Sequence, residues 1–126
     1  MIDAADPPRE MPSAARQDAL PPGAVVEWAP FRLAAGASEA ALLEASDAIQ
    51  RDFLRHRPGF LRRELLRGTD GQWADLLHWA DDDAASAAMG AAATSEACLA
   101  YFRLMDPGDG VGPGVGVLHL HRVRAY

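Results

Sequence analysis

The sequence predicts an α+β fold in which helices cover one face of a four-stranded antiparallel sheet. Three observations support this prediction. Strand-like and helix-like segments alternate in the order β-α-β-β-α-β, an Asp-Gly pair separates the two middle strands, and Asp or Ser residues stand where helices should begin. With 126 residues, the chain is long enough to bury one hydrophobic core and too short for two.

The domain begins with a strand and a long helix. Residues 24–33 are rich in β-forming side chains, and Pro30 within them indicates a sheet edge or a bulge. Ser38 is placed to cap a helix over residues 38–57, whose apolar residues recur at helical spacing. The Pro-Gly pair that starts at Pro58 is expected to end this helix.

The second half of the domain is predicted to contain two strands, two helices and a final strand. Residues 60–67 and 72–80 read as two strands joined by an Asp-Gly hairpin turn. An acidic run opens an Ala-rich helix over residues 81–93, and a second cap precedes a helix over residues 95–105. After a Gly-rich segment that does not match a dinucleotide-binding loop, residues 115–124 form the last strand.

Composition excludes several classes of protein. Residues 1–23 hold five prolines and no periodic apolar pattern, so we interpret 1–23 as a Pro/Ala-rich N-terminal arm and 24–126 as the domain. The net charge of −6 and the absence of a long apolar run argue against nucleic-acid and membrane partners. A single cysteine, Cys98, excludes an internal disulfide and fits a reducing, cytoplasmic setting.

The predicted element order is that of the ferredoxin-like plait, whose strands usually lie in the order 4-1-3-2. Helices on one side leave the other face of such a sheet uncovered, although it carries large apolar side chains. A second copy of the chain is the simplest cover for that face. We therefore expect a homodimer.

In these features the chain resembles the dimeric α/β-barrel superfamily, which includes antibiotic-biosynthesis monooxygenase-like domains. The resemblance covers residues 24–126 and rests on the element order, on the Pro-Gly-Phe sequence at residues 58–60, and on the aromatic-ended strand at residues 75–79. It implies a barrel of two sheets and a small-molecule pocket between sheet and helices. The implied activity is cofactor-free oxygenation or isomerisation of an aromatic or polyketide-like substrate. The alternative is a non-catalytic ligand-binding or structural dimeric module.

Two of the family's chemical groups are missing from this sequence. Oxygenases of the family commonly use an Asn near a Trp, and haem-degrading members commonly place a His ligand on the second helix. This chain contains no Asn, and residues 81–105 contain no His. We therefore expect no haem, and the resemblance to cofactor-free enzymes implies that no other cofactor is needed.

His119 and His121 are the candidate catalytic residues. They lie two apart on a strand and so share one face, and a neutral imidazole can act as general base toward a phenol or enol. Leu118 and Leu120 are expected to lie beneath the helices, which would turn the histidines toward the barrel. His78 could complete a metal site only across an intervening strand, so we predict no metal. Alternatively, the imidazoles are half-buried polar groups bonded to carboxylates.

Further candidates come from the other strands. Glu27 lies on the first strand, beside the last one, and could orient a histidine ring. The three tryptophans could line a flat cavity for a small aromatic ligand, or could fill the core or a dimer interface. Of the adjacent arginines in the second strand only one can point inward, where it binds an anionic group or pairs with a carboxylate. The predicted ligand-binding residues are Glu27, Trp28, Arg63, Trp73, His78 and Trp79.

Overall fold

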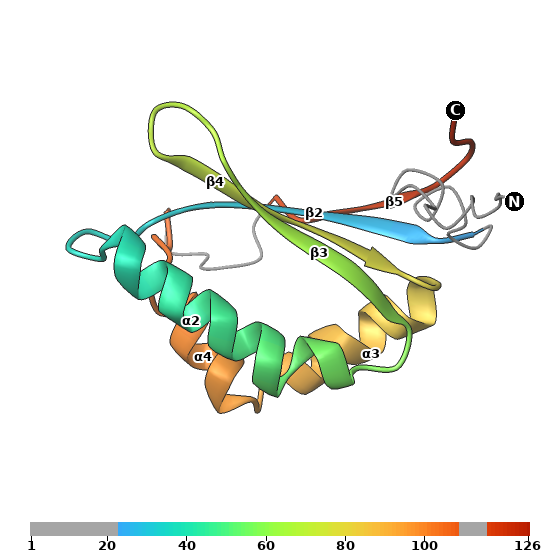
Figure 1. Cartoon of the computed structure of the whole chain (residues 1–126), viewed down its shortest axis with the longest axis horizontal. Coiled ribbons are helices and arrows are strands. Elements are labelled where there is room, and N and C mark those ends of the chain that lie inside the picture. The colour runs from blue at the N-terminus through green and yellow to red at the C-terminus, as the bar shows by residue number, and fades with distance from the viewer. Residues whose placement is uncertain (1–22, 109–115) are drawn as a thin grey trace, which may run out of the picture.

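The computed structural model shows a four-stranded antiparallel sheet with helices packed against one of its faces (Figure 1). It describes residues 23–108 and 116–126, so the predicted arm lies outside the described residues except for Gly23. The strand order β3-β4-β2-β5 is the plait order read from the opposite edge, which confirms the predicted fold class. The strands are β2 (Val25–Arg32), β3 (Phe60–Arg67), β4 (Gln72–Trp79) and β5 (Leu118–His121).

The helices begin at the residues that the sequence marks. The side chains of Ser38, Asp81 and Ser95 each accept a hydrogen bond from a backbone N–H three residues further on. These bonds satisfy donors that a first helical turn leaves free. The helical segments are α2 (Glu39–Asp52), the 3₁₀ turn η2 (Leu54–His56), α3 (Asp82–Ala92) and α4 (Glu96–Phe102).

The first helix ends earlier than expected. The predicted helix runs to residue 57, whereas α2 stops at Asp52. Phe53 has φ −131° and ψ −66°, which breaks the helical path, and η2 then carries the chain toward β3. Phe53 and Leu54 are both buried, so the break lets two consecutive apolar side chains enter the core.

The core lies between the sheet and the helices. Val25 and Leu42 are fully buried there, together with the aromatic rings of Trp79 and Tyr101. Of the helices in residues 23–108 and 116–126, none combines the length and the apolar character that a membrane crossing requires.

The β3-β4 hairpin turn has the predicted chemistry. Asp70 and Gly71 both have positive φ, at 57° and 78°, as a tight two-residue turn between right-twisted strands requires.

Pro30 lies on a central strand, not on an edge strand. However, β5 pairs only with the first four residues of β2, so Pro30 lies beyond that pairing and blocks no bond to β5.

The side chains of β5 point to the opposite faces of the sheet from those expected. His119 pairs with Glu27 and His121 with Val25, whose side chain is fully buried under the helices, so both histidines lie on the helix-covered side of the sheet. Leu118 and Leu120 are half-exposed on the other side. The expectation that the leucines lie beneath the helices is therefore wrong. Side chains of β2 and β4 already fill the core, and the leucines instead extend the uncovered face.

Gly59 allows the chain to enter β3 close to the first turn of α3. Its φ is +79°, and a Cβ at this position would lie 2.5 Å from the Cβ of Ala84. We expect Gly59→Ala to lower the free energy of unfolding by about 2–4 kcal/mol, from backbone strain and the clash together. Gly36→Ala is the matched control, because φ there is +85° and nothing lies within 4 Å of an added Cβ. Urea denaturation of both variants measures the difference, and equal losses would contradict a role for the clash.

Candidate functional site

A histidine and a carboxylate meet where β2 and β5 pair. The Glu27 Oε1 atom accepts a hydrogen bond from Trp79 Nε1 at 3.0 Å and lies 3.3 Å from His119 Nε2. The side chain of Glu27 is 14% exposed and that of His119 is 28% exposed, so the pair is shielded but reachable. The structure therefore places Glu27 in contact with a histidine of the last strand, as its position beside that strand suggested.

The Glu27 contact assigns roles to the two ring nitrogens of His119. An ionised carboxylate only accepts hydrogen bonds, so Nε2 of His119 donates to Glu27. In the neutral ring the lone pair then resides on Nδ1. Nδ1 is therefore the atom that can take a proton from a bound molecule, and the resulting imidazolium would be stabilised by Glu27.

The second histidine of β5 has a carboxylate partner of its own. His121 Nε2 lies 2.7 Å from Asp82 Oδ2, at the first residue of α3, and both side chains are exposed. The pair links the edge strand to the helix layer. Among the described residues, no group of three or more His, Cys, Asp or Glu side chains is arranged to hold a metal ion.

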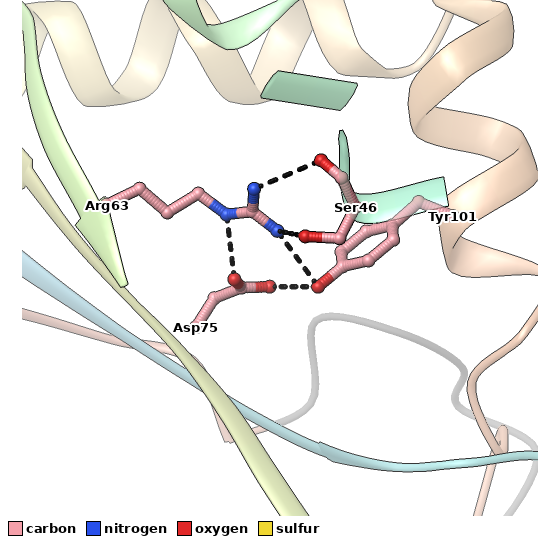
Figure 2. A network of polar contacts seen from close by, with 4 residues as sticks. All are labelled: Ser46, Arg63, Asp75 and Tyr101. Atoms are coloured by element: carbon pink, nitrogen blue, oxygen red, sulfur yellow. Dashed lines mark hydrogen bonds and ion pairs between the residues drawn. The ribbon is translucent and has the colours of Figure 1, made fainter. Parts of the chain in front are cut away.

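A second polar cluster is buried between the sheet and the helices (Figure 2). Arg63 Nε donates to Asp75 Oδ1 at 2.8 Å, and Arg63 Nη2 donates to Ser46 Oγ at 2.8 Å and to Tyr101 Oη at 3.1 Å. The Tyr101 hydroxyl donates to Asp75 Oδ2 at 2.7 Å. Burial, and then the Asp75 charge, raise the pKa of Tyr101, so its hydroxyl stays protonated and keeps donating. These four side chains form the Arg63 network.

The Arg63 network connects helices α2 and α4 to the sheet by hydrogen bonds. Ser46 comes from α2 and Tyr101 from α4, while Arg63 and Asp75 come from β3 and β4. The Arg63 and Asp75 side chains are only 7% and 8% exposed, so each charge is compensated by the other. Of the two adjacent arginines, Arg63 is the one that points inward. It pairs with the carboxylate of Asp75, which is the structural role and not the ligand-binding role considered for it from the sequence.

Sequence reasoning missed Ser46, Asp75 and Tyr101. A signal for Asp75 was present, because strand alternation puts it on the same face as Trp73 and Trp79, and a carboxylate among buried aromatic side chains must have a partner. The identity of that partner depends on strand register and helix packing, which the sequence does not display.

The remaining predicted ligand-binding residues lie on both faces of the sheet. Trp73 and Trp79 are buried on the helix side, and Trp73 stacks with Phe31. Trp28 and His78 lie on the uncovered side, because their strand positions alternate with these. His78 is therefore separated from His119 by β2 and by the thickness of the sheet. The predicted ligand residues do not gather at one site.

Comparison with known proteins gives a likeness in structure alone. No family model matches the chain, and no curated protein matches it in sequence. Among solved structures, SnoaB from Streptomyces nogalater, a cofactor-independent oxygenase, is similar with a TM-score of 0.60 and 19% identity, over 82% of this chain and 95% of that one. The likeness shows that the chain shares the fold of this oxygenase.

Other solved structures agree on the fold. A protein described as a candidate antibiotic biosynthesis monooxygenase from Chloroflexus aurantiacus has a TM-score of 0.57 at 13% identity, over 82% of this chain and 96% of its own. A protein of unknown function from Nitrosomonas europaea has a TM-score of 0.57 at 11% identity, over 82% and 92%. At such identities the likeness concerns architecture, so the chemistry must be argued from this chain's own residues.

Proposed function

We propose that the protein is a small-molecule enzyme of the antibiotic-biosynthesis monooxygenase-like type, which oxygenates or isomerises an aromatic or polyketide-like substrate without a cofactor. The observation that carries the proposal is the Glu27–His119 pair, a partly exposed imidazole held by a shielded carboxylate. The fold shared with a cofactor-independent oxygenase supports it. In this reaction His119 is the general base and Glu27 orients it.

Proton removal would start either reaction. His119 Nδ1 takes a proton from an acidic C–H or phenol of the substrate, which leaves an enolate or phenolate. In an isomerisation the proton returns at another carbon. In an oxygenation the substrate carbanion and dioxygen form a peroxide anion, which takes the proton back from His119 to give a hydroperoxide. The hydroperoxide then loses water, so that a CH₂ group becomes a carbonyl. Dioxygen is the oxidant, and one oxygen atom leaves as water.

The direct test uses quinol and polycyclic phenol probes with the purified full chain. Oxygen uptake together with a product that has gained one oxygen and lost two hydrogens identifies oxygenation. A product of unchanged mass without oxygen uptake identifies isomerisation. If no probe is turned over, the enzyme proposal fails for this class of substrate.

A non-catalytic small-ligand-binding or structural module is the second candidate. The buried polar groups of the Arg63 network bind one another, and Trp73 and Trp79 are packed in the core, so these groups are not free for a ligand. Calorimetric titration with the same probes separates the two candidates. Binding without turnover indicates a ligand-binding module, and the absence of both indicates a structural one.

We further propose that two copies pair through the uncovered sheet face. Four large apolar side chains on this face are between 36% and 52% exposed. Several large apolar side chains exposed on one face are typical of a surface that binds another protein. A second identical face would bury them by a two-fold interface. These side chains are Trp28, Leu66, Leu118 and Leu120.

Sedimentation at micromolar concentration should give about twice the 13.5 kDa chain mass. Leu120→Asp should shift the protein to monomer, because it places a charge within the apolar contact. Leu43→Asp is the matched control, since Leu43 is similarly exposed on α2, away from the sheet face. A wild-type monomer, or a dimer that tolerates Leu120→Asp, would contradict the proposed interface.

We also assign the protein to the cytoplasm. Cys98 is a buried free thiol, and burial raises its pKa, so it is an unreactive core residue that needs no oxidising compartment.

A further inference from the structure

His78 lies on the uncovered sheet face, near the end of the inner strand β4. On β4 it stands opposite Val26 of β2 and Arg62 of β3, so it is flanked by strands on both sides. Its Nδ1 atom is buried and has no hydrogen-bond partner among the described residues. The imidazole is thus partly buried, with one ring nitrogen shielded from water and without a partner.

The charges around His78 oppose its protonation. From β3 it is faced by Arg62 and Glu64, which pair with each other, and Arg122 approaches from the segment after β5. The neighbouring strand β2 contributes the apolar Val26. Burial lowers the pKa of His78, and the two arginines lower it further against the opposing effect of Glu64.

The hydrogen-bonding geometry acts in the same direction. A neutral imidazole can carry its proton on Nε2 and leave a lone pair on the buried Nδ1. Protonation would place an N–H group on Nδ1, where the described residues offer no acceptor. A buried donor without an acceptor is costly, so the buried position of Nδ1 favours the neutral form of the ring on geometric grounds.

We propose that His78 makes the association of two copies through the uncovered sheet face depend on pH. The copies pair while both imidazoles are neutral, and they separate when the imidazoles are protonated. This inference rests on the proposed dimer. Pairing removes the remaining water from His78, so a protonated ring is tolerated less in the dimer than in the single chain.

The direction of the pH dependence follows from proton linkage. Well above pH 6.5 the ring is neutral in both states, and pairing is unaffected. Burial and the arginines lower the pKa of His78 below 6.5 already in the separated chain, and as the pH falls through that lowered pKa the separated chain binds protons that the dimer resists, so lower pH favours separation. Each dimer contains two such rings, so their effects multiply, and we expect the dissociation constant to rise severalfold between about pH 8 and pH 5.

Sedimentation equilibrium of the full chain at several pH values and constant ionic strength tests the proposal, with circular dichroism to verify that the chain stays folded. His78→Gln should remain dimeric at low pH, because its neutral amide cannot be protonated. Arg62→Gln should move the separation to higher pH, because it removes a cation beside the ring. His121→Gln is the matched control and should keep the wild-type pH dependence, because His121 lies on the opposite side of the sheet.

The possible outcomes separate the two proposals. A wild-type chain that is monomeric at pH 8 overturns the dimer and this inference with it. A wild-type dimer with the same dissociation constant at every pH overturns only the role of His78. A pH dependence that persists unchanged in His78→Gln also overturns that role, and it assigns the titration to another group.

Discussion

Asp75→Ala should lower the free energy of unfolding by about 3–5 kcal/mol, because it leaves the buried guanidinium of Arg63 without its carboxylate. The same substitution removes the acceptor of the Tyr101 hydroxyl, which is itself buried. Urea denaturation followed by tryptophan fluorescence measures the loss. A large loss is expected because the Arg63 network joins both helix α2 and helix α4 to the sheet.

A surface ion pair provides the control for this prediction. Arg67 donates to both carboxylate oxygens of Glu39, but their side chains are 61% and 48% exposed. Glu39→Ala should therefore cost less than about 1 kcal/mol. The double variant Arg63→Met with Asp75→Leu should recover part of the stability lost in Asp75→Ala, since it removes both buried charges. Similar losses in Asp75→Ala and Glu39→Ala would show that the buried pair contributes no more than a surface one.

Local signals made most of the fold predictable. Ser38, Asp81 and Ser95 begin helices because their side-chain oxygens bind backbone N–H groups only three residues away. The Asp-Gly turn determines the β3-β4 hairpin because both of its residues must adopt positive φ. Each of these features is a property of a short segment, and a sequence displays it directly.

The orientation of β5 was not predictable in the same way. Alternation separates its histidines from its leucines, but it does not tell which set faces the helices. The answer depends on Glu27 of β2, which needs a polar neighbour beside the buried indole of Trp79 and finds it in His119. A residue-based argument that weighed only the apolar character of Leu118 and Leu120 therefore reached the opposite orientation.

The Arg63 network illustrates a different limit. Arg63 and Asp75 lie on paired strands, and Ser46 and Tyr101 reach them from two helices far apart in the sequence. Their meeting depends on the packing of the helix layer, which no periodicity encodes. The sequence could have shown that Asp75 is buried, and so that a cation must lie near it, without identifying which one.

His119→Gln should lower kcat on an accepted substrate by about 10²–10⁴-fold, the usual contribution of a general base. Glutamine keeps a polar side chain at the edge of the sheet, so the fold and the dimer should be unchanged, which circular dichroism and sedimentation verify. Glu27→Gln should reproduce much of the loss, because an amide no longer requires Nε2 of His119 to donate and so no longer holds the lone pair on Nδ1. His56→Gln is the control, since His56 bonds the backbone oxygen of Arg51 on the surface.

The pattern of kinetic constants distinguishes catalysis from binding. A base acts in the transition state, so His119→Gln should reduce kcat and kcat/KM together and leave KM nearly unchanged. A rise in KM at constant kcat would mean that the imidazole only helps to hold the ligand. Unchanged kinetics in both His119→Gln and Glu27→Gln would exclude the pair from the reaction. Because Glu27 also accepts from Trp79, its substitution should be followed by thermal denaturation, so that a loss of folded protein is not taken for a loss of catalysis.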